Sequence, residues 1–305
     1  MRHNLIVILG PNASGKTRMA VRLAKDLGTE IISADSRQVY RGMDIGTGKD
    51  LSDYIVGGVR VPYHLIDIVD PDHEFSVYEF QRRFLDCFSE ITARGKVPIL
   101  AGGTGLYIES VLRCFRMFPV SEDQDLRREL EGLGMEGLSR RLLELNPGIH
   151  NTTDLGSRER VLRAIEIARY TLDHPDEEIA MPEIRPLVFG ISRDRKALRE
   201  RISERLKRRL DGGRMVEEVR RLHDAGLSWE ALERFGLEYR YVSRYLRKQI
   251  SGEEMFKTLN IRIRQFAKRQ DTWFRGMERR GVEIIWIGGD DYEALRERVR
   301  ALAGL

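Results

Sequence analysis

Near its start the chain reads Leu5-Ile6-Val7-Ile8-Leu9, followed at once by Gly10-Pro11-Asn12-Ala13-Ser14-Gly15-Lys16-Thr17. The first five residues are apolar and rich in β-branched side chains, which predicts a strand buried on both faces of a parallel sheet. The next eight match the P-loop pattern G-x-x-x-x-G-K-[ST], placed between a predicted strand and a predicted helix, where that pattern is meaningful. A parallel α/β sheet is therefore the predicted core.

The same eight residues predict a site for phosphate groups. The glycines let backbone N–H groups close around phosphate oxygens, and the following helix directs its positive end at them. Lys16 would neutralise charge, and the hydroxyl of Thr17 would hold Mg²⁺, the predicted cofactor. The pattern does not say whether the phosphates belong to a nucleotide. A glycine-rich turn with a chance lysine is the structural alternative.

Strands and helices alternate through the first 115 residues, which is typical of a parallel α/β unit. Residues 119–186 read as helices only, and the apolar run at 187–191 then restores a strand. We therefore predict one P-loop core, residues 1–115 and 186–305, with an all-helical insertion at residues 116–185. Further strands are expected at 30–33, 97–101 and 282–287, and helices at 15–27, 77–92, 125–130, 138–145, 158–170, 194–210, 228–235, 239–249, 253–279 and 292–302.

Two turns that follow predicted strands carry further candidate residues. Asp35 comes after the strand at 30–33, at the carboxyl end where ligands bind in open parallel sheets. Its carboxylate could hold Mg²⁺ or accept a proton, and a helix N-cap is an equally good interpretation. The strand at 97–101 runs into Gly102-Gly103-Thr104-Gly105, without the acid that many P-loop ATPases place there. These glycines indicate either close approach of a ligand or a tight turn.

Charge is abundant but uneven. Charged residues make up 33% of the chain, with a net charge of only +4, so local basic faces matter more than the total. Lys and Arg cluster at 193–221 and at 257–280, the second cluster interleaved with Phe266, Trp273 and Phe274. We interpret the cationic face as an RNA-binding surface, and Phe266 and Trp273 as core residues.

The run at residues 5–9 is too short for a signal peptide or a membrane span, so we expect a cytoplasmic protein without membrane association. The two cysteines, Cys87 and Cys114, have no partner at metal-binding or redox spacing.

Four blocks of sequence, in this order, make the chain recognisable. They are GPNASGKT at residues 10–17, ISADSRQVYRGMDIGTGK at 32–49, PILAGGTGLYI at 98–108 and RQFAKRQDTWFR at 264–275. Together they resemble the bacterial tRNA dimethylallyltransferases, also called tRNA isopentenyltransferases, over nearly the full length.

The resemblance implies an activity. The P-loop would grip the diphosphate of dimethylallyl diphosphate instead of ATP. The N6 amine of the adenosine just 3′ of the anticodon would attack the allyl group, and diphosphate would leave. By similarity Asp35 is the general base, Thr17 and Mg²⁺ belong to the diphosphate site, and Arg205 reaches the diphosphate. The implied partners are dimethylallyl diphosphate and the anticodon stem-loop of tRNA, bound by a monomer.

The resemblance also implies which residues contact tRNA. The implied contacts come from the turn after the second strand, from the glycine-rich turn and from the insertion; they are Asp35, Ser36, Arg37, Gln38, Thr104, Arg127, Glu159, Arg160, Val161, Leu162 and Arg163. Two positions depart from the family pattern. Asn12 stands where Thr is common, and Glu238 replaces the usual glycine before Tyr239.

Two other functions compete with this one. A nucleotide or small-molecule kinase would use the same cradle, with Asp35 positioning the acceptor. The missing acid after the strand at 97–101 and the basic C-terminal helices count against it. An RNA-binding protein with a degenerate P-loop is the non-enzymatic alternative, and the intact Lys16 and Thr17 count against that.

Overall fold

The structure is a computed structural model and describes residues 2–147, 156–174 and 181–303. The chain forms two units. Met1–Phe115 and Pro182–Leu305 together make the first, here called the core unit, and Arg116–Met181 make the second, here called the insertion.

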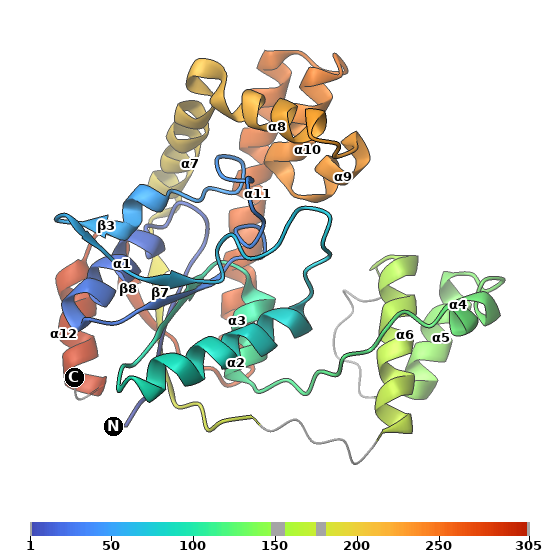
Figure 1. The fold of residues 1–305 in the computed structure, drawn as a ribbon, viewed down its shortest axis with the longest axis horizontal. Coiled ribbons are helices and arrows are strands. Elements are labelled where there is room, and N and C mark those ends of the chain that lie inside the picture. The colour runs from blue at the N-terminus through green and yellow to red at the C-terminus, as the bar shows by residue number, and fades with distance from the viewer. Residues whose placement is uncertain (1, 148–155, 175–180, 304–305) are drawn as a thin grey trace. The chain divides into compact units, whose positions relative to one another are not determined.

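A six-stranded sheet lies at the centre of the core unit (Figure 1). Its strand order is β5-β2-β6-β1-β7-β8, and every pairing is parallel. The strands are β1 (Leu5–Leu9), β2 (Ile31–Ala34), β5 (Tyr63–His64), β6 (Ile99–Gly102), β7 (Pro186–Ser192) and β8 (Ile285–Gly288). The predicted parallel α/β core is confirmed. A small antiparallel hairpin, β3 (Ile55–Val56) with β4 (Val59–Arg60), and the edge strand β5 were not predicted.

Both faces of the sheet are covered. Helices α1 (Lys16–Leu27) and α12 (Tyr292–Ala303) share one apolar cluster with Ile6 and Ile8 of β1. The alternate side chains of β1, on the opposite face, are equally inaccessible to water. Burial on both faces is the physical reason why this strand is an uninterrupted apolar run.

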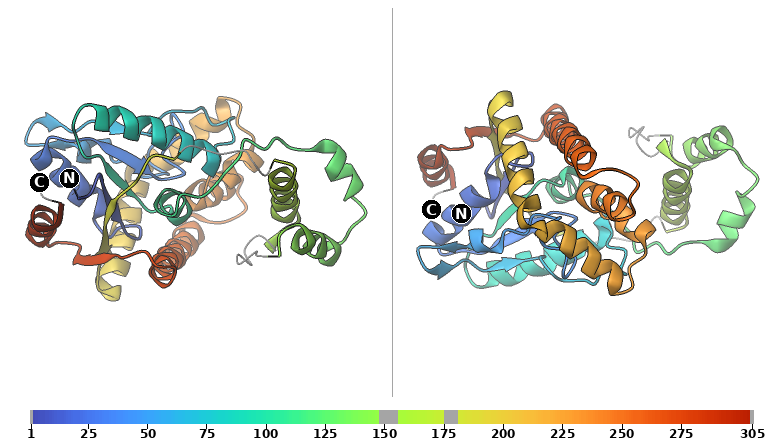
Figure 2. Two further views of the ribbon diagram at one scale, coloured as in Figure 1. Left: turned by 90° about the horizontal axis from the view of Figure 1, so that it is seen from below. Right: turned by 90° about the horizontal axis from the view of Figure 1, so that it is seen from above.

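The core unit contains further helices, some of which pack on other helices and not on the sheet (Figure 1). They are α2 (Val77–Ala93), α3 (Gly105–Leu112), α7 (Arg195–Leu210), α8 (Arg214–Asp224), α9 (Trp229–Arg234), α10 (Leu237–Leu246) and α11 (Gly252–Arg279), with 3-10 turns at Leu51–Tyr54 and Asp211–Gly213. The Ser251 side chain accepts from Glu254 N and caps α11, as its sequence predicts. Helices α7 and α11 lie side by side, where Arg264 donates to Ser203 Oγ at 2.7 Å (Figure 2).

The insertion has its own small core. Its helices are α4 (Gln124–Glu129), α5 (Met135–Leu145) and α6 (Arg158–Asp173). Each is amphipathic, and their apolar faces meet in one cluster that includes Leu138, Leu142 and Ile165, all fully buried. Among the helices that the structure describes, none is both long enough and apolar enough to cross a bilayer.

Candidate active site

The carboxyl ends of four neighbouring strands meet at one edge of the sheet. Leu9 at the end of β1 pairs with Gly102 of β6 and Gly190 of β7, and Gly102 also pairs with Ala34 of β2. The turns that follow these strands therefore emerge together. They carry the P-loop, Asp35, Thr104 and Arg193. This edge is where ligands bind in open parallel sheets.

The P-loop presents an open helix end. Helix α1 begins at Lys16, directly after Gly15, whose φ of 102° is in the left-handed region that favours glycine. No side chain caps this end, and no acid stands in the first turn of the helix. The backbone N–H groups and the positive end of α1 can therefore serve an anion, as the sequence predicts. Thr17 is half-buried in that first turn.

Two arginines that follow β7 hold the P-loop backbone from outside. Arg193 Nε donates to the carbonyl oxygen of Ser14 at 2.8 Å, and Arg201 Nε donates to that of Ala13 at 3.1 Å. With these carbonyls engaged, the loop keeps a conformation in which Ala13 has a positive φ of 65°. Arg193 also donates to Gly289 O at 2.9 Å, which ties the loop to the segment after β8.

Lys16, Asp35 and Arg205 form one electrostatic group. Burial lowers the pKa of the Lys16 ammonium to about 8, the carboxylate of Asp35 opposes this shift, and the charge of Arg205 reinforces it. Each of the three side chains therefore lies within the electrostatic reach of another. The structure brings together the P-loop lysine and the two residues to which the sequence assigns proton transfer and diphosphate contact.

Asp35 is held by its own turn. Its Oδ1 accepts from Arg37 N at 3.0 Å, an i to i+2 bond of the Asx-turn type. Residues 36–39 are a turn, so Asp35 does not cap a helix. Burial raises the pKa of Tyr54 and of Tyr107, and the charge of Asp35 raises both further, so these two phenols lie near its carboxylate.

Thr104 joins the turns after β2 and β6. Its Oγ1 accepts from Ser36 N at 3.0 Å, and its backbone N–H donates to Ala34 O at 3.1 Å. The other two residues of the Asp35 turn make separate contacts. Arg37 Nη1 donates to Arg234 O at 2.9 Å, and Gln38 Nε2 donates to Gly48 O at 3.3 Å.

The glycines beside Thr104 are closely approached by the protein itself. A Cβ on Gly102 would lie 2.1 Å from Ala34 O, and one on Gly105 would lie 2.3 Å from Trp273 Cδ1. The sequence left open approach of a ligand or a tight turn, and the groups that crowd Gly102 and Gly105 instead belong to β2 and α11 of the protein itself. Trp273, predicted as a core residue, is only partly buried, and the place of its ring against the turn requires glycine at 105.

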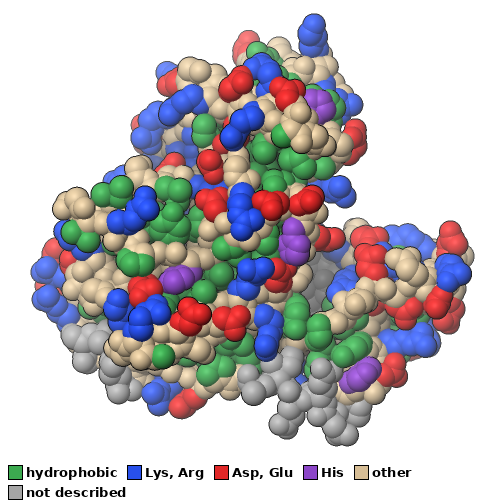
Figure 3. Space-filling view, viewed as in Figure 1, with side chains coloured by type: hydrophobic (Ala, Val, Ile, Leu, Met, Phe, Trp, Pro, Cys, Tyr) green, Lys and Arg blue, Asp and Glu red, His purple; other side chains and the backbone are tan. Residues whose placement is uncertain are grey.

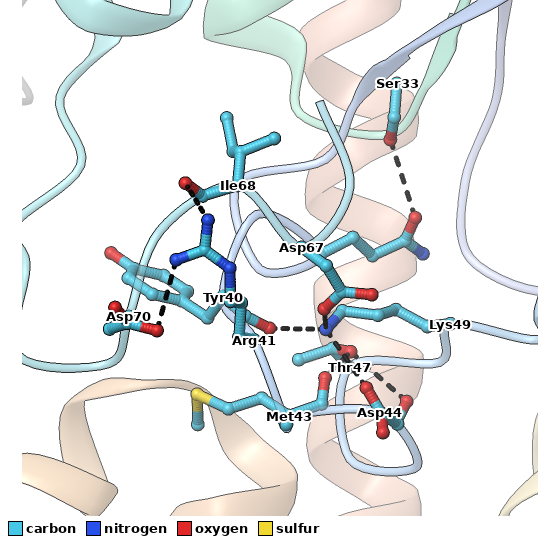
Figure 4. Close-up of polar contacts among 12 residues, drawn as sticks. Ser33, Tyr40, Arg41, Met43, Asp44, Thr47, Lys49, Asp67, Ile68 and Asp70 are labelled. Atoms are coloured by element: carbon cyan, nitrogen blue, oxygen red, sulfur yellow. Dashed lines mark hydrogen bonds and ion pairs between the residues drawn. The ribbon is translucent and has the colours of Figure 1, made fainter. Parts of the chain in front are cut away.

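Residues 40–50 form a loop, here called the 40–50 loop, that is fixed by a buried cation (Figure 4). The Lys49 side chain is inaccessible to water, and its ammonium contacts Asp44 Oδ1 at 3.1 Å. It also donates to Tyr40 O and forms an ion pair with Asp67. Because a buried ammonium needs partners of opposite charge, these contacts fix both ends of the loop against the segment that contains Asp67.

Helix α7 brings arginines to this loop. Arg205 Nη2 donates to Asp50 Oδ2 at 2.7 Å and to Gly48 O at 3.3 Å, and Arg209 Nη2 lies 3.6 Å from the same carboxylate. Burial would raise the pKa of Asp50, but the two guanidiniums outweigh it and lower that pKa. Burial and, to a lesser extent, the charge of Arg205 together lower the pKa of Arg209 to about 10. Arg205 and Arg209 thus share the single carboxylate of Asp50, so this part of the 40–50 loop keeps a net positive charge.

A buried carboxylate on α8 holds the 40–50 loop from the other side. Glu218 Oε2 accepts from the backbone N–H groups of Asp44 and Ile45 at 3.0 and 2.7 Å. Its Oε1 accepts from Gly46 N at 3.0 Å and from Tyr239 Oη at 2.7 Å. This residue escaped the sequence analysis, which predicted no helix at 214–224, and no local motif marks it.

The insertion carries the other residues to which the resemblance gives a tRNA contact. Val161 and Leu162 are buried in its apolar core, so their side chains are not at the surface. The Arg127 guanidinium is paired with Glu166 at 2.6 Å and with Glu159 at 2.9 Å. Arg163 donates to Val120 O at 2.6 Å and is half-exposed, and Arg160 is exposed. The charged side chains at the surface of this segment are Glu159, Arg160 and Arg163.

Helices α10 and α11 enclose a basic groove of about 420 Å³, here called the arginine groove. It is lined by Leu237, Arg240, Tyr241, Arg244, Arg262 and Arg269. Within the described ranges, Glu233 forms an ion pair with Arg244. The structure records no ion pair for Arg262 or Arg269. On the face drawn in Figure 3, basic and acidic side chains stand side by side over most of the surface. The groove is thus a local feature, consistent with a modest net charge.

One prediction for α11 is wrong. Phe266 is 38% exposed, so it is not a core residue, and the Arg269 guanidinium lies 5.7 Å from its ring centre. Phe274 is fully buried and takes the core position instead. The helical pattern did not separate these two aromatic residues, which lie eight positions apart. An exposed aromatic beside arginines is available for stacking on a base.

Comparison with known proteins agrees with this geometry. The family model described as IPP transferase matches residues 38–277. The chain is 58% identical to tRNA dimethylallyltransferase 1 of Syntrophus aciditrophicus over 305 residues, which cover 98% of each protein.

Solved structures agree as well. The full-length tRNA isopentenylpyrophosphate transferase of Bacillus halodurans is 34% identical, with a TM-score of 0.70 over 99% of this chain and 96% of that one. A eukaryotic dimethylallyltransferase acting on tRNA is 22% identical and shares the fold, with a TM-score of 0.77 over 99% of this chain and 79% of that one. Both the sequence relatives and the fold agree with the resemblance read from the four sequence blocks, and the chain belongs to the IPP transferase family.

Proposed function

We propose that this protein transfers a dimethylallyl group from dimethylallyl diphosphate to the N6 amine of the adenosine 3′-adjacent to the anticodon in tRNA. One observation carries the proposal. A phosphate cradle with an intact Lys16 lies within electrostatic reach of Asp35, at the sheet edge where both can face one ligand. The family membership and the names of the relatives support the same reaction.

The chemistry requires the amine and the leaving group on opposite sides of one carbon, with a proton acceptor beside the amine. The N6 nitrogen forms a bond to C1 of the allyl group, and the bond from C1 to the diphosphate oxygen breaks. Diphosphate leaves with the electron pair, and the amine proton passes to the carboxylate of Asp35. A carboxylate that accepts this proton in the transition state makes a weak exocyclic amine a competent nucleophile.

The cradle would stabilise the departing diphosphate. The open N-terminus of α1 offers N–H groups, Lys16 and Arg205 offer charge, and Arg193 and Arg201 keep the loop in shape. Burial lowers the pKa of Lys16, and a bound diphosphate would supply negative charge that favours its ammonium form.

Mg²⁺ fits these residues as a partner of the diphosphate. Within the described ranges, no three His, Cys, Asp or Glu side chains gather as metal ligands. Mg²⁺ does not need such a cage, because it commonly binds through one or two protein oxygens, substrate phosphates and water. The Thr17 hydroxyl would be its protein ligand, with Asp35 nearby, and the ion would add charge neutralisation for the leaving group.

The tRNA would be bound by more than one surface. The arginine groove offers guanidiniums for phosphates, and Phe266 offers a ring for an unstacked base. Asp35 to Gln38 and Thr104 would contact the adenosine. In the insertion, Arg127, Glu159, Arg160 and Arg163 would contact the stem-loop, while the buried side chains of Val161 and Leu162 would support them from the core. We further propose that the protein acts as a monomer in the cytoplasm.

A phosphoryl-transfer function has less support. Strand β6 ends at Gly102, and Gly103 and Thr104 follow, so no carboxylate stands where P-loop ATPases hold their metal. ATP hydrolysis is therefore the control for the test of the proposed function, not a second candidate.

The test is transfer of labelled dimethylallyl from its diphosphate to an unmodified tRNA transcript with Mg²⁺. The matched control is the same transcript with guanosine in place of the adenosine 3′ of the anticodon. The proposal predicts label on the first transcript only, with ATP left intact in a parallel reaction. Label on both transcripts, or phosphate release from ATP without label on tRNA, contradicts it.

A further inference from the structure

One side chain of α11 connects the two loops that line the site. Gln270 is buried, with 7% of its surface exposed. Its Oε1 accepts from Asn12 N in the P-loop at 2.8 Å, and its Nε2 donates to Gly103 O after β6 at 2.8 Å. The bonded partners lie 258 and 167 residues away in the chain. A single amide thus sets the spacing between the P-loop and the turn that carries Thr104.

The surroundings leave this amide little freedom. A Cβ on Gly103 would lie 2.6 Å from Gln270 Nε2, so a larger residue at 103 would displace the amide from this position. Ala267 and Phe274, on the same face of α11, are buried as well. Without Gln270, the part-buried Asn12 N–H and the buried Gly103 carbonyl would each lose this partner, and the loops would move to find others.

The amide must also point one way. Asn12 N is a donor and Gly103 O is an acceptor, so the side chain between them needs one acceptor and one donor at a fixed separation. Glutamine meets this requirement, whereas a carboxylate lacks the donor and a shorter amide cannot span both partners. Position 270 therefore needs the hydrogen-bonding groups of glutamine, and not merely a side chain of the same volume.

Gln270 also lies next to the nucleic-acid side of the helix. Arg269 is its neighbour in sequence, and Phe266 stands one turn before it, both exposed. The arginine groove side of α11, which carries Arg262 and Arg269, therefore lies about a quarter of a turn away from Gln270, which fixes the phosphate cradle from the neighbouring face. The helix that would contact tRNA is the one that fixes the shape of the cradle.

We propose that Gln270 is a positioning residue that holds the P-loop and the Gly103–Thr104 turn in the spacing that a diphosphate requires. The idea deepens the proposed function and rests on it for the identity of the allyl donor. Its test uses inorganic diphosphate alone, so that the two ideas can fail separately.

The experiment is calorimetric measurement of the Kd for inorganic diphosphate with Mg²⁺, using the full chain. Gln270→Met keeps the volume and removes both hydrogen bonds, and Gln265→Met is the matched control on the exposed face of the same helix. The Kd is expected to rise about tenfold or more in Gln270→Met, as the loss of both hydrogen bonds implies, and to stay within about twofold in the control.

Gln270→Asn is the second variant, in case the methionine variant does not fold. It keeps an amide but shortens the reach, and its Kd is expected to rise in the same way. Melting temperatures measured beside the Kd values separate positioning from stability. A folded variant that melts lower but binds diphosphate as the wild type does overturns the proposal.

Transfer kinetics give a second readout. Positioning of the cradle predicts a higher KM for dimethylallyl diphosphate in both variants, with the KM for tRNA within about threefold of wild type. Equal loss of affinity for both substrates overturns the proposal. If the wild type binds diphosphate but transfers no allyl group, the proposed function fails while the inference about Gln270 stands.

Discussion

Ser36 N donates a hydrogen bond to Thr104 Oγ1 at 3.0 Å, and this bond joins the turn that carries Asp35 to the turn after β6. The two turns follow neighbouring strands, so the bond adds a side-chain link where the sheet itself ends. Thr104 thereby fixes the approach to the carboxylate that the proposed reaction needs.

This link predicts different outcomes for two substitutions of Thr104. Thr104→Val keeps the shape but leaves Ser36 N without its acceptor, and we expect kcat/KM for transfer to fall about tenfold. Thr104→Ser keeps the hydroxyl and should remain within about threefold of wild type. Steady-state kinetics on the same tRNA check this. Equal activities for the two variants would mean that the hydroxyl is not what matters.

The charge of Lys16 makes donor binding dependent on pH. Because burial lowers its pKa to about 8, the folded free protein loses this proton near that pH, while the unfolded chain keeps it up to the ordinary value of 10.5. The neutral form is thus favoured in the folded state, and this group adds stability as the pH rises from about 8 towards 10.5. Diphosphate needs the charged form, so its affinity should fall over that same window.

Proton uptake measures this linkage. At about pH 8.5, binding of diphosphate should restore the proton on Lys16, which calorimetry in two buffers of different ionisation enthalpy detects. Lys16→Arg carries its charge throughout, so it should take up fewer protons than the wild type. The same number of protons in both proteins would show that Lys16 is already charged in the free site.

Glu218 is predicted to matter for stability through the 40–50 loop. Removal of its carboxylate in Glu218→Ala leaves three backbone donors without their acceptor, so the free energy of unfolding should fall by about 2–4 kcal/mol. Glu217 is adjacent, but its side chain is 65% exposed. Glu217→Ala should therefore cost less than about 0.5 kcal/mol. Urea denaturation of both variants tests the difference, and similar midpoints would argue against the clamp.

The arginine groove predicts a change in the salt dependence of tRNA binding. Arg262 and Arg269 line the groove. If each contacts one phosphate, the double variant Arg262→Ala with Arg269→Ala should reduce the slope of log K against log salt by about 1–2. Arg298→Ala, at an exposed position of α12, is the control. An unchanged slope in the double variant, or an equal change in the control, would place the tRNA elsewhere.

Local sequence was sufficient for the elements that local physics dictates. Residues 5–9 predict a buried strand because both of its faces pack against helices, and glycine with lysine at 15–16 marks the start of α1. Strand β5, only two residues long at an edge, has no length over which a period can show. Helix α8 follows Gly212-Gly213, both at positive φ, and no helix was predicted there.

Some residues of the candidate site could likewise be predicted from local sequence, and others could not. Lys16, Thr17 and Asp35 could be predicted because each stands at the end of a strand or in a motif. Gln270, Glu218 and Lys49 could not, because each acts through contacts with segments that only the folded sheet brings near. The wrong prediction for Phe266 has a related cause. Periodicity shows that a helix has an apolar face, but a neighbouring aromatic can lie just outside it.

The central claim is that Asp35 takes the proton from the attacking amine, and one measurement tests it most directly. Asp35→Asn retains an Oδ1 that can accept from Arg37 N, so the turn should survive while the proton acceptor is lost. In a single turnover with saturating tRNA and dimethylallyl diphosphate, we expect the rate of transfer to fall by about 10²–10⁴, with the Kd for tRNA within about threefold of wild type. A rate within tenfold of wild type, in a folded variant that binds tRNA, would contradict the account.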